Sequence, residues 1–252
     1  MVHIVGAGCG AADLITLRGK KMIENADVII YAGSLVNPQL LEYARKDCRI
    51  YDSSKMDLDE VIDVMKSAED EGLDTVRLHT GDPSIYGAVR EQMDRLKALG
   101  IGYDICPGVS SLFGAAAALK AEYTLPGVSQ TVIVTRMEGR TPVPEAEAIA
   151  KLAEHGATMV IFLSASMTDK LQEELLKGAY DEDTEAAIVY KATWEDEKIV
   201  RCRLGDLHGS AVRAGIKNLA LIAVGGFLGN DYELSRLYDA SFETAFREAK
   251  KD

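Results

Sequence analysis

The chain has 252 residues, of which 47% are hydrophobic and 27% are charged, and its formal net charge is −12. This length and composition allow a sizeable buried core, which excludes disordered, collagen-like and disulfide-scaffold proteins. The acidic balance disfavours nucleic acid and anionic membrane surfaces as partners, because binding to either relies on Lys and Arg. A small anionic ligand remains compatible with the sequence where a few cations gather locally.

No apolar run approaches the length of a transmembrane helix, and a strand pattern begins directly after Met1. We therefore expect no signal peptide and no membrane span, and we expect a cytoplasmic protein. The four cysteines, Cys9, Cys48, Cys106 and Cys202, lie far apart and form no Cys-x-x-Cys pair. This spacing is typical of free thiols in a reducing compartment, and we expect no metal site.

Strand and helix signals alternate along the first half of the chain. Strands are expected at Val2–Val5, Val28–Tyr31, Asp74–Thr80 and Tyr103–Cys106. Helices are expected from a Thr16 cap to Asn25, from an Asn37 cap with Pro38 at the first position, from an Asp57 cap, from Ser84 to Leu99, and from Ser111 to about Lys120. The clearest of these is the third, because Asp57 and Glu60 form a capping-box-like pair before an apolar face.

Turn chemistry at residues 122–127 ends this series, and the predicted domains are 1–121 and 122–252. In the second domain, strands are expected at Thr131–Thr135, Thr158–Leu163, Ala186–Tyr190, Ile199–Arg203 and Leu219–Val224. Helices are expected near Glu145–Glu154, Thr168–Lys177 and Leu207–Ala214. The alternation predicts an α/β fold of two tandem domains with largely parallel sheets.

Three glycine-containing loops follow predicted strands of the first domain, where ligands bind to open α/β sheets. They are Gly6–Gly10, Thr80–Gly87 and Pro107–Ser111. Glycines allow a backbone to approach a ligand closely, and a helix start near Ser84 would supply free N–H groups. The last two loops follow what we take to be neighbouring strands, so they should converge on one cleft. The alternatives are a merely tight turn for the first loop and a simple helix cap for Asp82.

Other chemistry-bearing residues leave both functional and structural interpretations open. Arg136 and Arg140 flank a loop that could clamp carboxylates, or they lie on a solvated surface loop. His79 borders the Thr80 loop or is a packed strand histidine, and Trp194 covers a ligand or packs in a core. A nicotinamide site is disfavoured, because the second strand ends at Tyr31 without the carboxylate that binds a ribose. No Ser-His-Asp order supports hydrolysis.

Four segments together resemble the tetrapyrrole methylase family over nearly the whole chain. They are Gly6–Gly10 continuing through Leu14–Gly19, Gly81–Pro83, Pro107–Ser111 and Ala220–Gly225. The resemblance implies two α/β domains with S-adenosylmethionine in the cleft between them, release of S-adenosylhomocysteine, and a homodimer. The first loop departs from the Gly-Pro-Gly that is usual in the family, since Cys9 stands in place of the proline and removes its stiffness.

Within the family, three further segments resemble the enzymes that methylate ring carbon C11 in cobalamin biosynthesis. They are Tyr31–Val36, Arg136–Pro142 and Ala192–Lys198. The uroporphyrinogen-III methyltransferases carry a Tyr-Asp pair where this chain has Tyr31 and Ala32, which favours a different substrate here. The sequence does not decide whether the macrocycle contains cobalt.

The resemblance also assigns residues to the site. The cofactor is expected to touch Cys9, Thr80, Gly81, Asp82, Ile85, Ser110, Ser111, Leu163, Tyr190, Ala192 and Ala220. Local cations for the substrate carboxylates are expected at Arg136, Arg140 and Lys55; no catalytic acid or base is assigned. The alternatives are another tetrapyrrole methylase, diphthine synthase, a ribosomal-RNA methyltransferase, which the acidic charge disfavours, and a tetrapyrrole carrier without turnover.

Overall fold

The strand β4 (Thr75–His79) lies at the centre of the first sheet and is buried along its whole length. The sheet has the order β3-β2-β4-β1-β5, and its strands pair in parallel. The other strands are β1 (Val2–Gly6), β2 (Val28–Tyr31), β3 (Arg49–Asp52) and β5 (Tyr103–Cys106). Parallel pairing is as predicted here, and burial on both faces explains the apolar runs. The edge strand β3 was not predicted, because its first two residues are exposed and mask its pattern.

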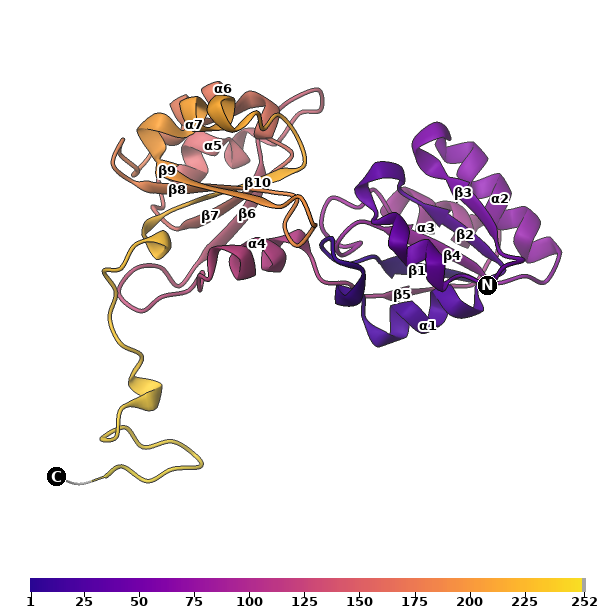
Figure 1. Cartoon of the computed structure of the whole chain (residues 1–252), viewed down its shortest axis with the longest axis horizontal. Coiled ribbons are helices and arrows are strands. Elements are labelled where there is room, and N and C mark those ends of the chain that lie inside the picture. Colours follow the sequence, from indigo (N-terminus) through magenta and orange to yellow (C-terminus); the bar gives the residue numbers. More distant parts are fainter. Residues whose placement is uncertain (251–252) are drawn as a thin grey trace. The chain divides into compact units, whose positions relative to one another are not determined.

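Four α-helices belong to this part of the chain: α1 (Leu17–Asn25), α2 (Leu58–Asp70), α3 (Arg90–Ala98) and α4 (Ser111–Leu119). The sheet is covered by α1 on one face and by α2 and α3 on the other (Figure 1). Thr16 caps α1 by accepting a hydrogen bond from Gly19 N at 3.1 Å. The capping box before α2 is confirmed, with Asp57 and Glu60 bonding each other's backbone N–H at 2.9 and 2.8 Å.

Two helix predictions in the first half were wrong. The helix predicted from Ser84 begins only at Arg90, because Asp82 holds Ser84 in a turn and Tyr86 and Ala88 have left-handed φ values of 53° and 49°. Such backbone cannot continue a right-handed helix. The segment after Asn37 forms a 3₁₀-helix, η3 (Pro38–Tyr43), in place of an α-helix, although Asn37 caps it as predicted.

The second sheet has the order β6-β7-β10-β8-β9. Its strands are β6 (Val132–Arg136), β7 (Thr158–Phe162), β8 (Glu185–Tyr190), β9 (Lys198–Arg203) and β10 (Ala220–Val224). β6 and β7 are parallel, but β10 runs antiparallel to both β7 and β8. The prediction of largely parallel pairing was therefore wrong for this sheet. Alternation of strands and helices does not encode the insertion of the last strand between two earlier ones.

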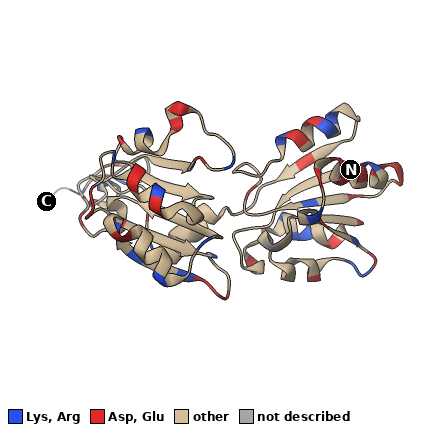
Figure 2. Ribbon diagram, turned by 90° about the horizontal axis from the view of Figure 1, so that it is seen from above, with Lys and Arg blue, Asp and Glu red and all other residues tan. Residues whose placement is uncertain are grey.

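One face of the second sheet is covered by α5 (Ile149–Ala153), α6 (Thr168–Leu175) and α7 (Leu207–Ala214) (Figure 1). The helix α5 is shorter than predicted, because residues 145–147 form the 3₁₀-helix η5. Charged residues lie mainly on helices and loops (Figure 2), and among the strands they are most frequent in the edge strands β3 and β9.

The computed structural model describes residues 1–250, and the chain divides into two compact units. The first unit consists of residues 1–118 together with 191–198, and the second of residues 119–190 together with those from 199 onward. The predicted division into domains 1–121 and 122–252 stays a prediction. Residues 251–252 of the second predicted domain lie outside the described part of the chain. The segment 191–198 follows β8 and includes the first residue of β9, but it belongs to the first unit.

Candidate functional site

The three glycine loops of the first unit meet at the carboxyl ends of their strands. The prediction that β4 and β5 are neighbouring strands was wrong, because β1 lies between them. The loops that follow β4 and β5 nevertheless converge. Gly8 and Gly81 exchange backbone hydrogen bonds at 2.9 and 3.3 Å. A Cβ on Gly108 would lie 2.2 Å from the carbonyl oxygen of Gly81 and 2.7 Å from Cα of Gly6. Only glycine fits where three backbones pack this closely.

Asp82 ties two of these loops together. Its Oδ2 accepts a hydrogen bond from Gly108 N at 2.8 Å, and its Oδ1 accepts from Ser84 N at 2.9 Å and from Ser84 Oγ at 2.5 Å. Burial raises the pKa of Asp82, but the hydrogen bonds from Ser84 and Gly108 outweigh it and hold the pKa below its ordinary value. The carboxylate is therefore ionised at neutral pH. The alternative of a helix cap was wrong, since no helix starts here.

The loop after Asp82 has a strained backbone. Tyr86 and Ala88 are left-handed, and a Cβ on Gly87 between them would lie 2.3 Å from the carbonyl oxygen of Pro83. Ile85 is half-buried within this loop. Non-glycine residues held in this region of backbone space are frequent at functional sites. The strain thus marks the loop that carries Asp82 and Ile85.

The remaining predicted residues of the first unit lie around the same edge. Thr80 donates its hydroxyl to the carbonyl of Leu35 at 3.2 Å. Ser110 is buried and its Oγ accepts from Leu112 N at 3.2 Å, while Ser111 is the first residue of α4. That helix begins directly after the Pro107–Ser111 loop, and the positive end of its dipole favours an anionic ligand there.

The segment 191–198 brings Ala192 to the first glycine loop. Ala192 is buried, and a Cβ on Gly10 would lie 2.6 Å from the Ala192 carbonyl oxygen and 2.3 Å from Cδ1 of Trp194. Trp194 is half-buried and packs on Gly10, and the alternative that it covers a ligand stays a prediction. Cys9 of the same loop is buried and contacts Thr193, a residue that sequence reasoning did not single out. Only a long-range contact could have revealed it.

His79 is a packed strand histidine. It is buried at the end of β4, and its Nε2 has no hydrogen-bond partner among the described residues. Burial, with the nearby charge of Arg77, lowers the pKa of His79 to about 3, so the imidazole is neutral. Arg77 is also buried, and it donates to Gln92 Oε1 at 3.0 Å and to the carbonyl of Ile30 at 3.2 Å.

In the second unit, three predicted residues lie at one edge of its sheet. Ala220 pairs with Tyr190 in the antiparallel register of β10 and β8. The register of β10 with β7 places the start of β10 beside the end of β7, where Leu163 follows. Leu163 is 66% exposed and left-handed, with a φ of 53°. An exposed, strained leucine beside two other predicted residues marks this edge as a candidate binding surface of the second unit.

The predicted cations differ in how they are held. Arg136 donates to the carbonyls of Met137, Thr141 and Pro142 at 3.3, 3.2 and 2.8 Å, so it closes its own loop. Arg140 lies exposed at the tip of that loop. Lys55 is 81% exposed, with its Nζ 3.7 Å from Asp52 Oδ2. Arg140 is thus the better placed of the two arginines to reach a ligand.

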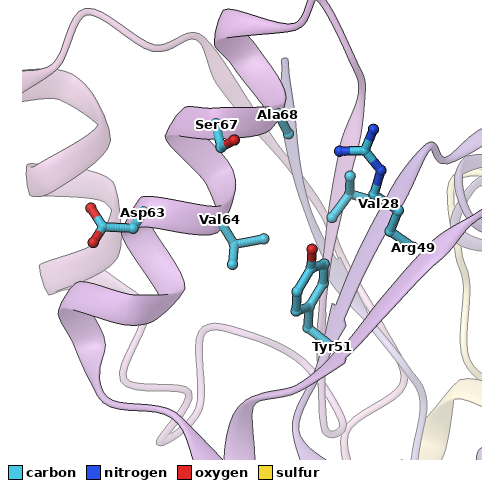
Figure 3. Close-up of a pocket in the computed structure, with 7 residues that line it drawn as sticks. All are labelled: Val28, Arg49, Tyr51, Asp63, Val64, Ser67 and Ala68. Atoms are coloured by element: carbon cyan, nitrogen blue, oxygen red, sulfur yellow. The ribbon is translucent and has the colours of Figure 1, made fainter.

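A pocket of about 250 Å³ lies elsewhere in the first unit, between α2 and the strands β2 and β3. It is lined by Val28, Arg49, Tyr51, Asp63, Val64, Ser67 and Ala68, of which Tyr51 directs its hydroxyl toward α2 (Figure 3). Arg49 already forms a two-pronged pair with Glu71 at 2.8 and 3.1 Å. None of the predicted site residues lines this pocket.

Two further findings concern the described part of the chain. Across residues 1–250, no three or more His, Cys, Asp or Glu side chains come together as metal ligands would. None of the helices in that range combines the length and the apolar character that a bilayer crossing requires.

Comparison with known proteins identifies the class to which this fold and these loops belong. The family described as Tetrapyrrole (Corrin/Porphyrin) Methylases matches residues 1–208, and the chain belongs to this family. The predicted family and its two-domain α/β fold are thereby confirmed.

The individual relatives are similar over almost their whole length. The chain is 57% identical over 251 residues to the cobalt-precorrin-4 C(11)-methyltransferase of Methanocaldococcus jannaschii, covering 99% of this chain and 97% of that protein. It is 44% identical to a precorrin-4 C(11)-methyltransferase of Sinorhizobium sp, covering 98% of each. The solved structure of a cobalt precorrin-4 methyltransferase of cobalamin biosynthesis matches with a TM-score of 0.89 at 45% identity, covering 91% of this chain and 96% of that one.

Proposed function

We propose that this chain is an S-adenosylmethionine-dependent methyltransferase that adds a methyl group to C11 of precorrin-4 or cobalt-precorrin-4 in cobalamin biosynthesis. The observation that carries the proposal is the 57% identity, across 99% of the chain, to a protein of that activity. A uroporphyrinogen-III C-methyltransferase of Bacillus subtilis is less similar, at 30% identity over 92% of the chain. Ala32, where such enzymes carry an aspartate, agrees with the C11 assignment.

The cofactor site of the first unit is formed by Cys9, Thr80, Gly81, Asp82, Ile85, Ser110, Ser111 and Ala192. The residues fit a ligand with an α-amino acid group. Asp82 is ionised, and its Oδ2 accepts one hydrogen bond in the structure, so a lone pair is left for an ammonium group. The amino end of α4 at Ser111 would hold the carboxylate. Leu163, Tyr190 and Ala220 of the second unit stay predictions from the family resemblance.

Methyl transfer to C11 does not require a strong acid or base from the protein. The sulfonium of S-adenosylmethionine supplies an electrophilic methyl group, and C11 is already nucleophilic because a ring nitrogen pushes electron density into it. The residues of this chain therefore act mainly by alignment, which can supply much of the acceleration. A rigid set of glycine loops serves that purpose, since it fixes the backbone around Asp82. The neutral His79 lies buried at the end of β4, one residue before Thr80.

The substrate carries carboxylates around its macrocycle, and a chain of net charge −12 needs local cations to bind it. Arg140 is proposed for this role because it is exposed, while Arg136 acts by holding the loop that presents it. Lys55 is a further candidate, since its side chain is largely exposed and its amine lies 3.7 Å from Asp52 Oδ2.

The proposal is tested with purified protein, S-adenosylmethionine carrying an isotopically labelled methyl group, and either macrocycle. We expect a product that has gained one labelled methyl group at C11, located by NMR. Calorimetric binding of S-adenosylhomocysteine, abolished in Gly81→Trp and retained in Gly102→Ala, would support the cofactor site. Gly81 has a left-handed φ of 62°, whereas a Cβ on Gly102 meets no atom within 4 Å. A label at another carbon, or no turnover with bound cofactor, would overturn the assignment.

The homodimer and the cytoplasmic location belong to this proposal as well. Both rest on the family resemblance and the composition of the chain. Light scattering should give twice the chain mass of 27.3 kDa. A monomeric mass at micromolar concentration would contradict the dimer.

A further inference from the structure

The segment 191–198 forms a closed hook on the first unit. Lys191 Nζ pairs with Asp196 Oδ2 at 2.7 Å and lies 5.2 Å from the centre of the Trp194 ring. Thr193 N donates to Glu197 Oε2 at 2.7 Å, and Glu197 N donates back to the Trp194 carbonyl at 3.1 Å. The hook thus has internal bonds that fix its shape, independent of the loop on which it lies.

The hydroxyl of Thr193 joins the hook to the first glycine loop at two points. Its Oγ1 accepts a hydrogen bond from Ala11 N at 3.0 Å and donates one to Cys9 Sγ at 3.5 Å. These two residues flank Gly10, on which Trp194 packs, and Asn37 Nδ2 donates to the Gly10 carbonyl at 3.0 Å from the other side. Gly10 is therefore fixed in three ways: Thr193 bonds both of its neighbours, Trp194 packs against its Cα, and Asn37 bonds its carbonyl.

The backbone of the hook is strained to make these contacts. Lys191 and Thr193 have left-handed φ values of 46° and 70°. A β-branched residue is seldom found in that region, because its side chain crowds the backbone. Asparagine or glycine would relieve the strain at Thr193 but would not offer a hydroxyl in the same position. The hydroxyl contacts of Thr193 thus occur together with a backbone conformation that threonine disfavours, a combination that is frequent at functional sites.

We propose that Thr193 is a positioning residue for the cofactor, which acts through Cys9 and Ala11 by holding the Gly8–Ala11 turn in its binding conformation. The proposal rests on the proposed function, because it takes that turn to be part of the S-adenosylmethionine site. The loop differs from the family pattern by having Cys9 in place of a stiff proline, and the hook supplies from outside the rigidity that the proline would give. The expected partner of this turn is S-adenosylmethionine and not the macrocycle.

The test compares Thr193→Val, Thr193→Ser and a matched control, Thr184→Val, in the full chain. Valine keeps the shape and the β-branch but removes both hydrogen bonds, whereas serine keeps the hydroxyl. Thr184 makes an equivalent pair of bonds in the second unit, accepting from Asp181 N at 3.0 Å and donating to Asp181 Oδ1 at 2.9 Å. For each variant we would measure the Kd of S-adenosylhomocysteine by calorimetry, the KM of both substrates, and the unfolding midpoint.

We expect Thr193→Val to raise the Kd of S-adenosylhomocysteine about fivefold or more, as the loss of a hydrogen bond predicts. The KM of the tetrapyrrole should not change, and Thr193→Ser should restore wild-type binding. Gly10→Ala, whose Cβ would displace Trp194, should weaken binding in the same direction. Equal Kd values for Thr193→Val and wild type, or equal losses in Thr193→Val and Thr184→Val, would overturn the positioning role alone. A wild-type protein that binds no S-adenosylhomocysteine would overturn the proposed function, and the positioning role with it.

Discussion

The carboxylate of Asp82 and the backbone N–H of Gly108 form a 2.8 Å hydrogen bond that joins the loop after β4 to the loop after β5. The two residues are separated in the sheet by β1, so this bond spans the loop of the intervening strand. Charge-assisted hydrogen bonds of this kind are about twice as strong as neutral ones. Asp82 is therefore a structural part of the candidate site as well as a candidate ligand-binding group.

Replacing Asp82 by Asn should weaken both the fold and the site. Asparagine offers one acceptor oxygen, whereas the carboxylate accepts three hydrogen bonds, so at least one donor loses its partner. We expect the free energy of unfolding to fall by about 1–3 kcal/mol at pH 7, measured by urea denaturation. The exposed Asp231→Asn is the control and should leave the stability unchanged.

The wild type and Asp82→Asn can also be compared as a function of pH. The pKa of Asp82 is lowered in the folded state, so its carboxylate adds stability above the ordinary value of 3.8, and this stability is lost as the pH falls through the folded value. The difference between wild type and Asp82→Asn should accordingly shrink below about pH 4. A constant difference across that range would contradict the ionised carboxylate.

Gly108→Ala should be one of the most damaging small substitutions in the first unit. Its Cβ would lie 2.2 Å from the backbone oxygen of Gly81, which cannot move without breaking the contact of Gly81 with Gly8. We expect a loss of at least about 2 kcal/mol in the free energy of unfolding. Gly102→Ala, where a Cβ meets nothing within 4 Å, is the matched control. Equal stability of the two variants would show that the loops tolerate rearrangement.

His79 should make the fold sensitive to mild acid. Its pKa falls from an ordinary value of 6.5 to about 3 through burial and the charge of Arg77, so between these values the unfolded chain binds a proton that the folded chain does not. Stability therefore drops as the pH falls below 6.5, by about 1.4 kcal/mol per pH unit. Between pH 6.5 and 5 the wild type should lose roughly 2 kcal/mol more than His79→Gln. Parallel pH profiles would rule out a buried neutral imidazole.

Arg140→Ala should raise the KM of the tetrapyrrole about tenfold, the size expected for one lost charge-assisted contact, and leave the Kd of S-adenosylhomocysteine unchanged. Arg136→Ala should also raise that KM, and it should make the loop at 137–142 more sensitive to protease, because three carbonyls lose their donor. The exposed Lys217→Ala serves as the charge control. A tetrapyrrole KM that stays constant in Arg140→Ala would remove this residue from the substrate site.

Local chemistry made much of the first unit predictable. Thr16 and the pair Asp57 and Glu60 carry their capping signal within four residues, and each cap is formed as expected. The burial of β2 follows from its continuous apolar character, whereas β4, which contains Thr75, Arg77 and His79, is buried because it lies at the centre of the sheet. The loop at 84–89 was not predictable in this way, because Tyr86 and Ala88 adopt left-handed backbone that their residue types do not favour.

Long-range structure was the part that the sequence could not supply. Nothing near β10 indicates that it inserts between β7 and β8 in the opposite direction. The contact of Thr193 with Cys9 joins positions 184 residues apart, and no local pattern encodes it. Ala192 was assigned to the candidate site only through the family resemblance. Its neighbour Thr193, which bonds Cys9 and Ala11, was not assigned to the site at all.

The placement of segment 191–198 has a consequence for protein engineering. The chain passes between its two units at three points, so the units are not interchangeable modules that one cut would separate. A chimera that joins residues 1–118 of this protein to the second half of a relative would bring the relative's hook onto this protein's Gly10. A fragment ending at residue 118 would leave that glycine uncovered. Recombination of substrate specificities within this family should therefore exchange the hook together with the first half of the chain.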